Sequence, residues 1–324
     1  MAKQRLGIEL SALEAFVAVV EAGGMTAAAR RLGQTQSAVS QTIIALEKTL
    51  GVALLDRSVR PPAPTAAGAV LQARAGPLLA EARALAAGVR DAAGTALPRL
   101  RLALVDSLAA TVGPHLVRAL RDAASRWSLW SGLSEAHADA LRAREVDVIL
   151  ADDTVADGDG LLRRAVLREP YVLAVPADWK DAAARSLAEL AAARDMVRYS
   201  ARQITGRQIE RHLHRVGVAA PRRLEFDASD AVLAMVSAGV GWAITTPLCA
   251  LQARAALDGL RLLPLPGPGF ERRLSLFARR DELGDLPQRI AATTATILHR
   301  ESLPALTATA AWLPQRIHVG DAAE

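Results

Sequence analysis

Residues 26–50 constrain the fold of this chain most, because two short helical stretches there flank a tight turn at Gly33. Thr26 is a candidate N-cap for the first helix. Gly33 suits a turn that needs positive φ, and the second helix is expected to begin at Thr35 or Gln36. The pattern predicts a helix-turn-helix, in which the second helix reads DNA.

The second helix has one apolar face, because Val39, Ile43, Leu46 and Leu50 recur at steps of three and four residues. The polar side chains near its start should therefore face outward. Amides can bond bidentately to adenine, and hydroxyls can bond bases or phosphates. The candidate DNA contacts from the two helices are Thr26, Gln36, Ser37, Ser40, Gln41 and Thr42.

These landmarks extend in a fixed order beyond the two helices, through Leu46-Glu47 and Leu54-Leu55-Asp56-Arg57 to Thr65-Ala-Ala-Gly68. Over this stretch the chain resembles the N-terminal winged helix-turn-helix of the LysR-type transcriptional regulators. The resemblance implies double-stranded DNA as a partner. Ile44 departs from the pattern, since many members carry a basic residue there, and an ordinary Ala-rich helical hairpin is the alternative.

Residues 54–65 contain too many prolines for a helix and resemble the β-wing of the same family. Arg57 and Arg60 are therefore candidate contacts to phosphate or to the minor groove, with solvated loop charges as the alternative. Arg30 and Arg31, at the end of the first helix of the motif, are candidate backbone clamps.

Charge alone does not establish DNA binding. One of Arg30 and Arg31 is alternatively expected to pair with Glu47 or Asp56. The formal net charge of +5 and the pI near 10.1 permit DNA binding without requiring it.

A long helix-forming segment follows, from Thr65 to about Ala93, and its apolar residues repeat at steps of four and three. Such a repeat buries a narrow stripe against a partner helix, so the segment predicts a dimer. Pro77 is expected to kink it, and packing of the stripe on the chain's own C-terminal domain is the alternative. Two paired reading heads would bind a roughly palindromic site. The predicted seam consists of Leu71, Ala75, Leu78, Ala82, Leu85 and Val89.

After Pro98 the pattern changes to alternating strands and helices, which predicts α/β sheets with covered faces. This part resembles the LysR-type effector domain, in which two α/β subdomains close on a small molecule as periplasmic binding proteins do. The crossings between subdomains are expected near residues 173–176 and 274–278.

Four regions are expected in all. A winged helix-turn-helix covers residues 1–66, and a dimerising linker helix and hinge cover 67–97. The effector domain covers 98–303, with one subdomain at about 98–173 and 277–303 and the other at about 174–276. Residues 304–324 form a tail, expected to pack loosely or to be disordered.

Ligand sites in such folds lie at strand ends and helix starts, where free N–H groups favour anions. Asp106 would oppose a simple anion and suits an amine or a hydroxyl, so the small-molecule effector stays unidentified. The candidate effector contacts are Asp106, Ser107, Leu108, Arg198, Tyr199, Ser200, Arg202, Thr245 and Thr246.

No motif for catalysis, for a cofactor or for a metal is recognised, so an enzyme is not expected. Cys249 is the sole cysteine, which fits a reducing compartment, and packing is favoured over redox sensing. No signal peptide or membrane-spanning run is recognised, so a cytoplasmic location is expected. The sequence thus predicts an effector-responsive regulator that forms dimers or tetramers, with RNA polymerase as a further partner. An architectural DNA-binding protein with a purely oligomerising C-terminal domain is the alternative.

Overall fold

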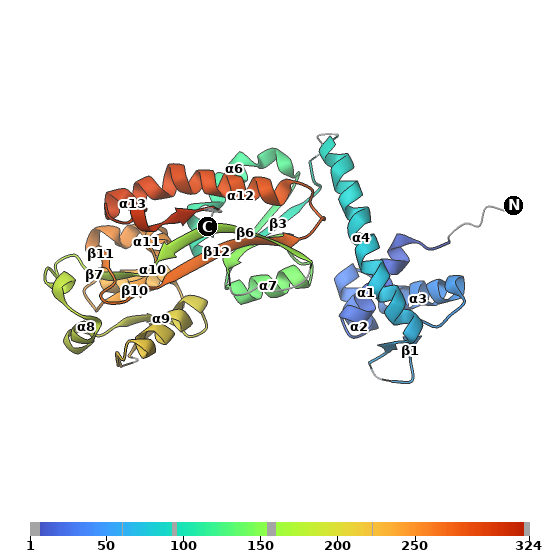
Figure 1. Cartoon of the computed structure of the whole chain (residues 1–324), viewed down its shortest axis with the longest axis horizontal. Coiled ribbons are helices and arrows are strands. Elements are labelled where there is room, and N and C mark those ends of the chain that lie inside the picture. Colours follow the sequence, from blue (N-terminus) through green and yellow to red (C-terminus); the bar gives the residue numbers. More distant parts are fainter. Residues whose placement is uncertain (1–6, 60, 93–95, 154–159, 222, 321–324) are drawn as a thin grey trace. The chain divides into compact units, whose positions relative to one another are not determined.

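The computed structural model describes residues 7–59, 61–92, 96–153, 160–221 and 223–320, and the chain divides into two compact units. The N-terminal unit comprises residues 1–94 with 280–284, and the C-terminal unit comprises 95–279 with 285–324. The first consists of helices and a short hairpin, whereas the second contains sheets covered by helices (Figure 1). Among the described helices, none combines the length and the apolar character needed to cross a membrane.

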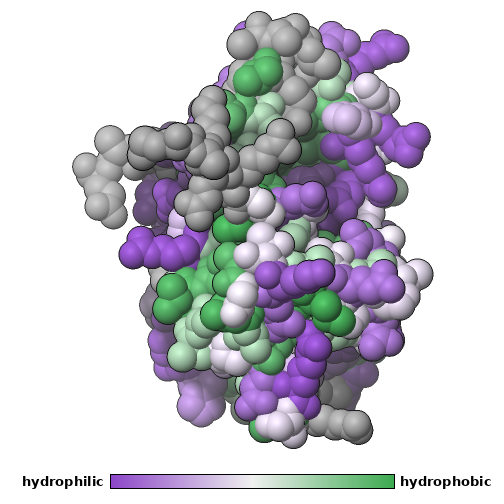
Figure 2. Space-filling model, turned by 90° about the vertical axis from the view of Figure 1, so that its right-hand side faces the viewer, coloured by the Kyte–Doolittle hydropathy of each residue, from purple (hydrophilic) through white to green (hydrophobic). Residues whose placement is uncertain are grey.

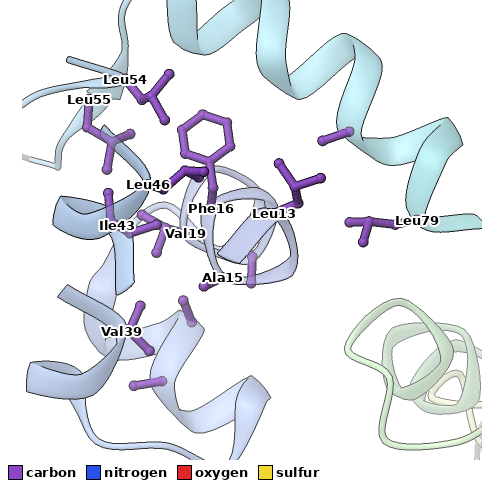
Figure 3. Packing of buried hydrophobic residues seen from close by; sticks show 14 residues of the cluster. Leu13, Ala15, Phe16, Val19, Val39, Ile43, Leu46, Leu54, Leu55 and Leu79 are labelled. Atoms are coloured by element: carbon purple, nitrogen blue, oxygen red, sulfur yellow. The ribbon is translucent and has the colours of Figure 1, made fainter. Parts of the chain in front are cut away.

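Three short helices, a hairpin and one long helix form the N-terminal unit. Its elements are α1 (Leu10–Glu21), α2 (Met25–Leu32), α3 (Gln36–Leu50), β1 (Leu55–Asp56), β2 (Ala63–Pro64) and α4 (Ala66–Ala92). The core lies where α1, α3 and the start of the wing meet, and Phe16, Val39 and Ile43 are fully buried there (Figure 3). β1 and β2 pair antiparallel. The predicted winged helix-turn-helix is therefore confirmed.

The turn between α2 and α3 follows the sequence closely, but the start of α2 does not. Gly33 adopts φ 65°, and the Thr35 side chain caps α3 by accepting from the Ala38 N–H at 3.2 Å. The prediction that Thr26 caps α2 is wrong. Gly24 holds the N-cap at φ 157°, a conformation that favours glycine, so the helix begins one residue before Thr26.

α4 is a single helix of 27 residues that contains Pro77. Its predicted seam divides between two environments. Ala75 is buried with Leu79 in the core of its own unit, and Leu71 packs against that core, because α4 lies along α1. These residues therefore do not form a free dimer seam, which corrects the prediction for Leu71 and Ala75. Ala82 is half-buried, and the other three members are exposed: Leu78 (52%), Leu85 (69%) and Val89 (62%).

Figure 2 turns the right-hand side of Figure 1 toward the viewer and shows patches of hydrophobic side chains bordered by hydrophilic ones. Exposed hydrophobic residues of the N-terminal unit are also found outside α4, at Leu10, Ile44 and Val52. Apolar exposure in this unit is thus not confined to the predicted seam.

The first lobe of the C-terminal unit is a six-stranded mixed sheet in the order β13-β6-β12-β5-β3-β4. Its strands are β3 (Leu100–Val105), β4 (Trp127–Gly132), β5 (Val148–Asp152), β6 (Leu161–Pro170), β12 (Glu271–Arg279) and β13 (His318–Val319). β3 pairs parallel to β4 and β5, whereas β12 pairs antiparallel to β5 and β6. Its helices are α5 (Asp106–Thr111), α6 (Gly113–Ala119), α7 (Ser134–Arg142) and α12 (Leu286–Ile297), and α13 (Leu303–Thr309) continues from α12 to contact α11 (Pro247–Gln252) of the second lobe.

The second lobe contains two small sheets. β7 (Val172–Pro176) lies between β10 (Ala243–Thr245) and β11 (Leu260–Pro264), with both pairs antiparallel, and β8 (Val197–Tyr199) pairs parallel to β9 (Leu224–Phe226). The helices of this lobe are α8 (Leu187–Ala193), α9 (Ile204–Arg215), α10 (Ser229–Ser237) and α11 (Pro247–Gln252). The predicted two-subdomain α/β architecture is confirmed.

The chain crosses between the lobes a few residues away from the predicted points. Residues 173–176 lie inside β7 and 274–278 inside β12, so each belongs to one sheet. The crossings instead follow the ends of the β6–β12 pair, where the Tyr171 N–H donates to the Phe270 carbonyl at 3.0 Å. The two connections therefore run side by side.

Residues 304–320 are folded rather than loose, contrary to the expectation for the tail. α13 begins at Leu303, and β13 adds an edge strand to β6. The burial of Leu306 and Leu313 explains this, since both side chains leave water when the segment packs.

Candidate functional site

The start of α3 presents the polar face that the sequence predicts for DNA contact. Gln36, Ser37 and Gln41 are exposed and Ser40 is half-buried, while Val39 and Ile43 are directed into the core. Two of the hydroxyls are already hydrogen-bonded: Thr42 donates to the Ala38 carbonyl at 2.9 Å within the helix, and the Ser37 hydroxyl bonds with the Thr35 hydroxyl at 3.0 Å. The exposed amides and hydroxyls are therefore the groups available to base edges and phosphates.

The predicted arginines of the DNA-binding unit have unequal surroundings. Arg30 and Thr26 are exposed on α2. Arg31 forms a salt bridge to Glu21 of α1 at 2.8 Å. The prediction that it pairs with Glu47 or Asp56 is therefore wrong. The reason is that the last turn of α2 lies beside α1. Arg60 lies outside the described residues.

Glu47 organises the wing, a role that sequence reasoning missed. One oxygen of its carboxylate accepts from the Leu54 and Leu55 N–H groups at 2.8 and 3.2 Å, and the other accepts from Arg57 at 2.9 Å. Asp56 instead accepts from Ser58. The Leu46-Glu47 landmark was the available signal, because a half-buried glutamate on the inner side of α3 needs hydrogen-bond donors.

In the C-terminal unit, a small polar cavity of about 30 Å³ lies between the two lobes. Its walls come from strand ends and the first turns of helices, as expected for ligand sites in α/β folds. The first lobe contributes Asp106, Ser107, Ser134 and Asp152, with Arg272 from β12. The second lobe contributes Gln203, Thr205, Ser229 and Cys249.

A buried charge cluster forms one wall of the cavity and joins both lobes to the crossing strands. Arg272 on β12 donates to both oxygens of Asp152 at 3.0 and 3.3 Å and to the Ser107 hydroxyl at 3.2 Å. Glu169 on β6 lies 3.7 Å from Arg272 and accepts from the Leu248 N–H of α11 at 2.9 Å. Ser134 donates to Asp152 at 2.8 Å and thereby ties the start of α7 to the same cluster.

Burial is the largest single influence on the pKa values of the ionisable groups around the cavity. It raises the pKa of Glu169, against the opposing effect of Arg272. It also lowers the pKa of His137, although the nearby Asp106 charge acts in the opposite direction. For Arg272, burial lowers the pKa, but the charges of Asp152 and Glu169 and the hydrogen bonds to Asp152 act together with other nearby groups to raise it well above its usual value, so the guanidinium stays protonated.

Of the nine predicted effector contacts, the structure brings Asp106 and Ser107 to the cavity. Leu108 is fully buried in the core of the first lobe. Tyr199 and Thr245 are buried and hydrogen-bonded to each other at 2.6 Å, and Thr246 caps α11 by accepting from the Cys249 N–H. The last four are structural in this arrangement, because their side chains lie in the core or are held by neighbouring groups.

The remaining three predicted contacts point to other partners. Arg198 is buried and pairs with Glu210, and the Ser200 hydroxyl donates to Asp227 at 2.6 Å. Arg202 is 76% exposed and lies 3.4 Å from Asp227. Sequence reasoning missed Asp152, Arg272, Thr205 and Ser229, since pairing between strands far apart in sequence brings the first two together.

Comparison with known proteins gives a consistent family assignment. Residues 10–69 match the bacterial regulatory helix-turn-helix proteins of the lysR family, and residues 93–294 match the LysR substrate binding domain. The chain belongs to the LysR family of transcriptional regulators. It is thus a DNA-binding regulator with an effector-binding domain, and the architectural alternative is not supported.

Known relatives agree in sequence and in fold. An uncharacterised HTH-type transcriptional regulator of Mycobacterium tuberculosis is 28% identical over 285 residues, which span 82% of this chain and 88% of the relative. A full-length OxyR variant from Pseudomonas aeruginosa has a TM-score of 0.59 at 20% identity, covering 91% of this chain and 96% of that one. An H2O2-bound OxyR variant from Corynebacterium glutamicum has a TM-score of 0.55 at 21% identity, covering 93% and 97%.

Proposed function

We propose that a small molecule binds in the cavity between the lobes and thereby changes how this regulator occupies its promoter DNA. The observation that carries the proposal is the position of the cavity, since residues of both lobes and Arg272 of a crossing strand line it. A ligand that contacts both walls binds one relative arrangement of the lobes better than another. Such differential affinity is what effector control requires.

DNA recognition is assigned to the exposed start of α3, with the wing and Arg30 as backbone contacts. Gln36, Ser40 and Gln41 supply donors and acceptors suited to base edges, and Arg57 supplies a charge for phosphate. The exposed apolar residues of α4 support a dimer, which would read a pseudo-palindromic site. A tetramer, contact with RNA polymerase and a cytoplasmic location remain predictions of this proposal.

Footprinting of the DNA upstream of the protein's own gene tests the proposal, with and without a metabolite panel. We expect a bounded, pseudo-palindromic footprint that changes with one class of compound. In competition binding, Gln36→Ala and Ser40→Ala should each lower preference for that site over random DNA by about 1–3 kcal/mol per lost base contact.

Arg30→Ala provides the comparison, because removal of a phosphate contact should weaken specific and random binding alike and reduce the salt dependence. Uniform protection of all sequences would contradict sequence-specific regulation. Unchanged discrimination in both α3 variants would exclude the assigned face, and a footprint indifferent to every compound would contradict effector control.

A further inference from the structure

The first-lobe wall of the cavity contains more acidic than basic side chains, with Asp106 and Asp152 against Arg272. Asp152 holds Arg272 bidentately, and Glu169 lies on the other side of the same guanidinium. Within the described part of the chain, no hydrogen bond or salt bridge engages the carboxylate of Asp106, although Asp106 lines the cavity. Burial lowers the pKa of the neighbouring His137 and so disfavours its cationic form, against the opposing effect of the Asp106 charge.

The opposite wall has the complementary character. Thr205 and Ser229 lie in the first turns of α9 and α10, helices of 12 and 9 residues, and both residues are buried at the cavity. First-turn N–H groups lack partners within their helix, and the helix dipole there favours negative charge. In the first lobe the start of α7 is already matched, because Ser134 is bonded to the Asp152 carboxylate.

The two walls favour opposite charges on a bound ligand. A purely anionic ligand would place its charge beside Asp106 with no counter-ion, at a cost in free energy that rises with burial. A simple amine would satisfy Asp106 but leave the starts of α9 and α10 unmatched. A molecule with both charges satisfies both walls.

We infer that the effector is a small zwitterion, whose ammonium pairs with Asp106 and whose carboxylate lies at the starts of α9 and α10. This inference rests on the proposed function of the cavity and adds the chemical class of the ligand. Asp106 then acts as the specificity-determining residue, since it rejects carboxylic acids that lack an amino group.

Thermal-shift and calorimetric titration of the full-length protein test this inference. The probes are the twenty standard L-amino acids, β-alanine and γ-aminobutyrate. For every zwitterion that binds, the matched acid without the amine and the matched amine without the acid are titrated, as propionate and ethylamine are for β-alanine. We expect saturable binding of a zwitterion and at least tenfold weaker binding of both analogues.

Asp106→Asn should weaken binding of the zwitterion at least tenfold, and Asp106→Glu should recover part of the loss. Asp122→Asn, which changes an exposed carboxylate of the same lobe, is the matched control and should bind as the parent protein does. The inference is overturned if no zwitterion binds, if an acid or an amine alone binds as tightly, or if Asp106→Asn binds normally.

Promoter footprints with the same compounds distinguish this inference from the proposed function. If a simple acid binds and alters the footprint, effector control holds and the zwitterion class is wrong. If a zwitterion binds through Asp106 without altering the footprint, the ligand class holds and effector control is wrong.

Discussion

At the scale of single residues, Gly68 shows how the Thr65-Ala-Ala-Gly68 landmark works. The Thr65 hydroxyl accepts from the Gly68 N–H at 3.0 Å and donates to the Ala53 carbonyl at 2.8 Å. A Cβ placed on Gly68 would lie 2.1 Å from the Leu54 carbonyl oxygen. The Thr65-Ala-Ala-Gly68 motif therefore holds the first turn of α4 against the beginning of the wing. Only glycine permits this close approach of its backbone to the Leu54 carbonyl.

We predict that Gly68→Ala destabilises the DNA-binding unit by about 1–3 kcal/mol, because backbone must shift to admit the methyl group. Urea unfolding followed by circular dichroism measures the change. Gly76→Ala is the matched control in the same helix, where the added Cβ meets nothing within 4 Å. It should stabilise by up to about 1 kcal/mol through helix propensity. Equal effects of the two substitutions would contradict the close approach at Gly68.

At the scale of elements, local sequence patterns predict the turns, caps and buried helix faces of this chain well. They do not predict which distant strands pair with one another. The turn at Gly33, the cap at Thr35 and the buried face of α3 follow from neighbouring residues, so the sequence suffices for them. By contrast, Asp152 and Arg272 are 120 positions apart and meet because β5 pairs with β12. Strand ends alone do not reveal that pairing, and most of the predicted cavity residues therefore lie elsewhere.

The same crossing strands lead to a prediction about pH. Burial raises the pKa of Glu169 above its usual value of 4.5, so the folded state retains a proton that the unfolded state releases. The contribution of Glu169 to stability is therefore full below pH 4.5 and declines as the pH rises toward the folded-state pKa. The slope of this decline is about 1.4 kcal/mol for each pH unit between the two pKa values.

Glu169→Gln should remove this decline, because an amide does not titrate and its oxygen can still accept from the Leu248 N–H. Chemical unfolding from pH 4.5 upward gives the difference in unfolding free energy between the parent and the variant, and the variant should gain on the parent as the pH rises. Glu301→Gln, which changes an exposed carboxylate of the same unit, is the control. A difference independent of pH would show that burial does not control this carboxyl.

At the scale of the whole molecule, the proposed dimer would join two DNA-reading heads. Leu78, Leu85 and Val89 are apolar, exposed and on one side of α4, whereas Ala75 and Leu79 are taken up by the core of the same unit. α4 can both pack on its own domain and present an exposed apolar side, since a helix of 27 residues is longer than the small core that it covers. The exposed part is then available to a second copy of the chain.

Charged residues at Leu78 and Leu85 should therefore separate the protomers while the DNA-binding core stays folded. We predict that the Leu78→Glu, Leu85→Glu double variant sediments as a monomer, because burying two glutamates at an interface costs more than the contact supplies. Its affinity for the full promoter site should fall about 100-fold or more, whereas its affinity for an isolated half-site should be unchanged. Val240→Glu, which alters an exposed apolar residue of the other unit, should leave both properties intact. A double variant that remains dimeric would place the interface away from α4, and a parallel loss of half-site binding would mean that the substitutions damage the reading head itself.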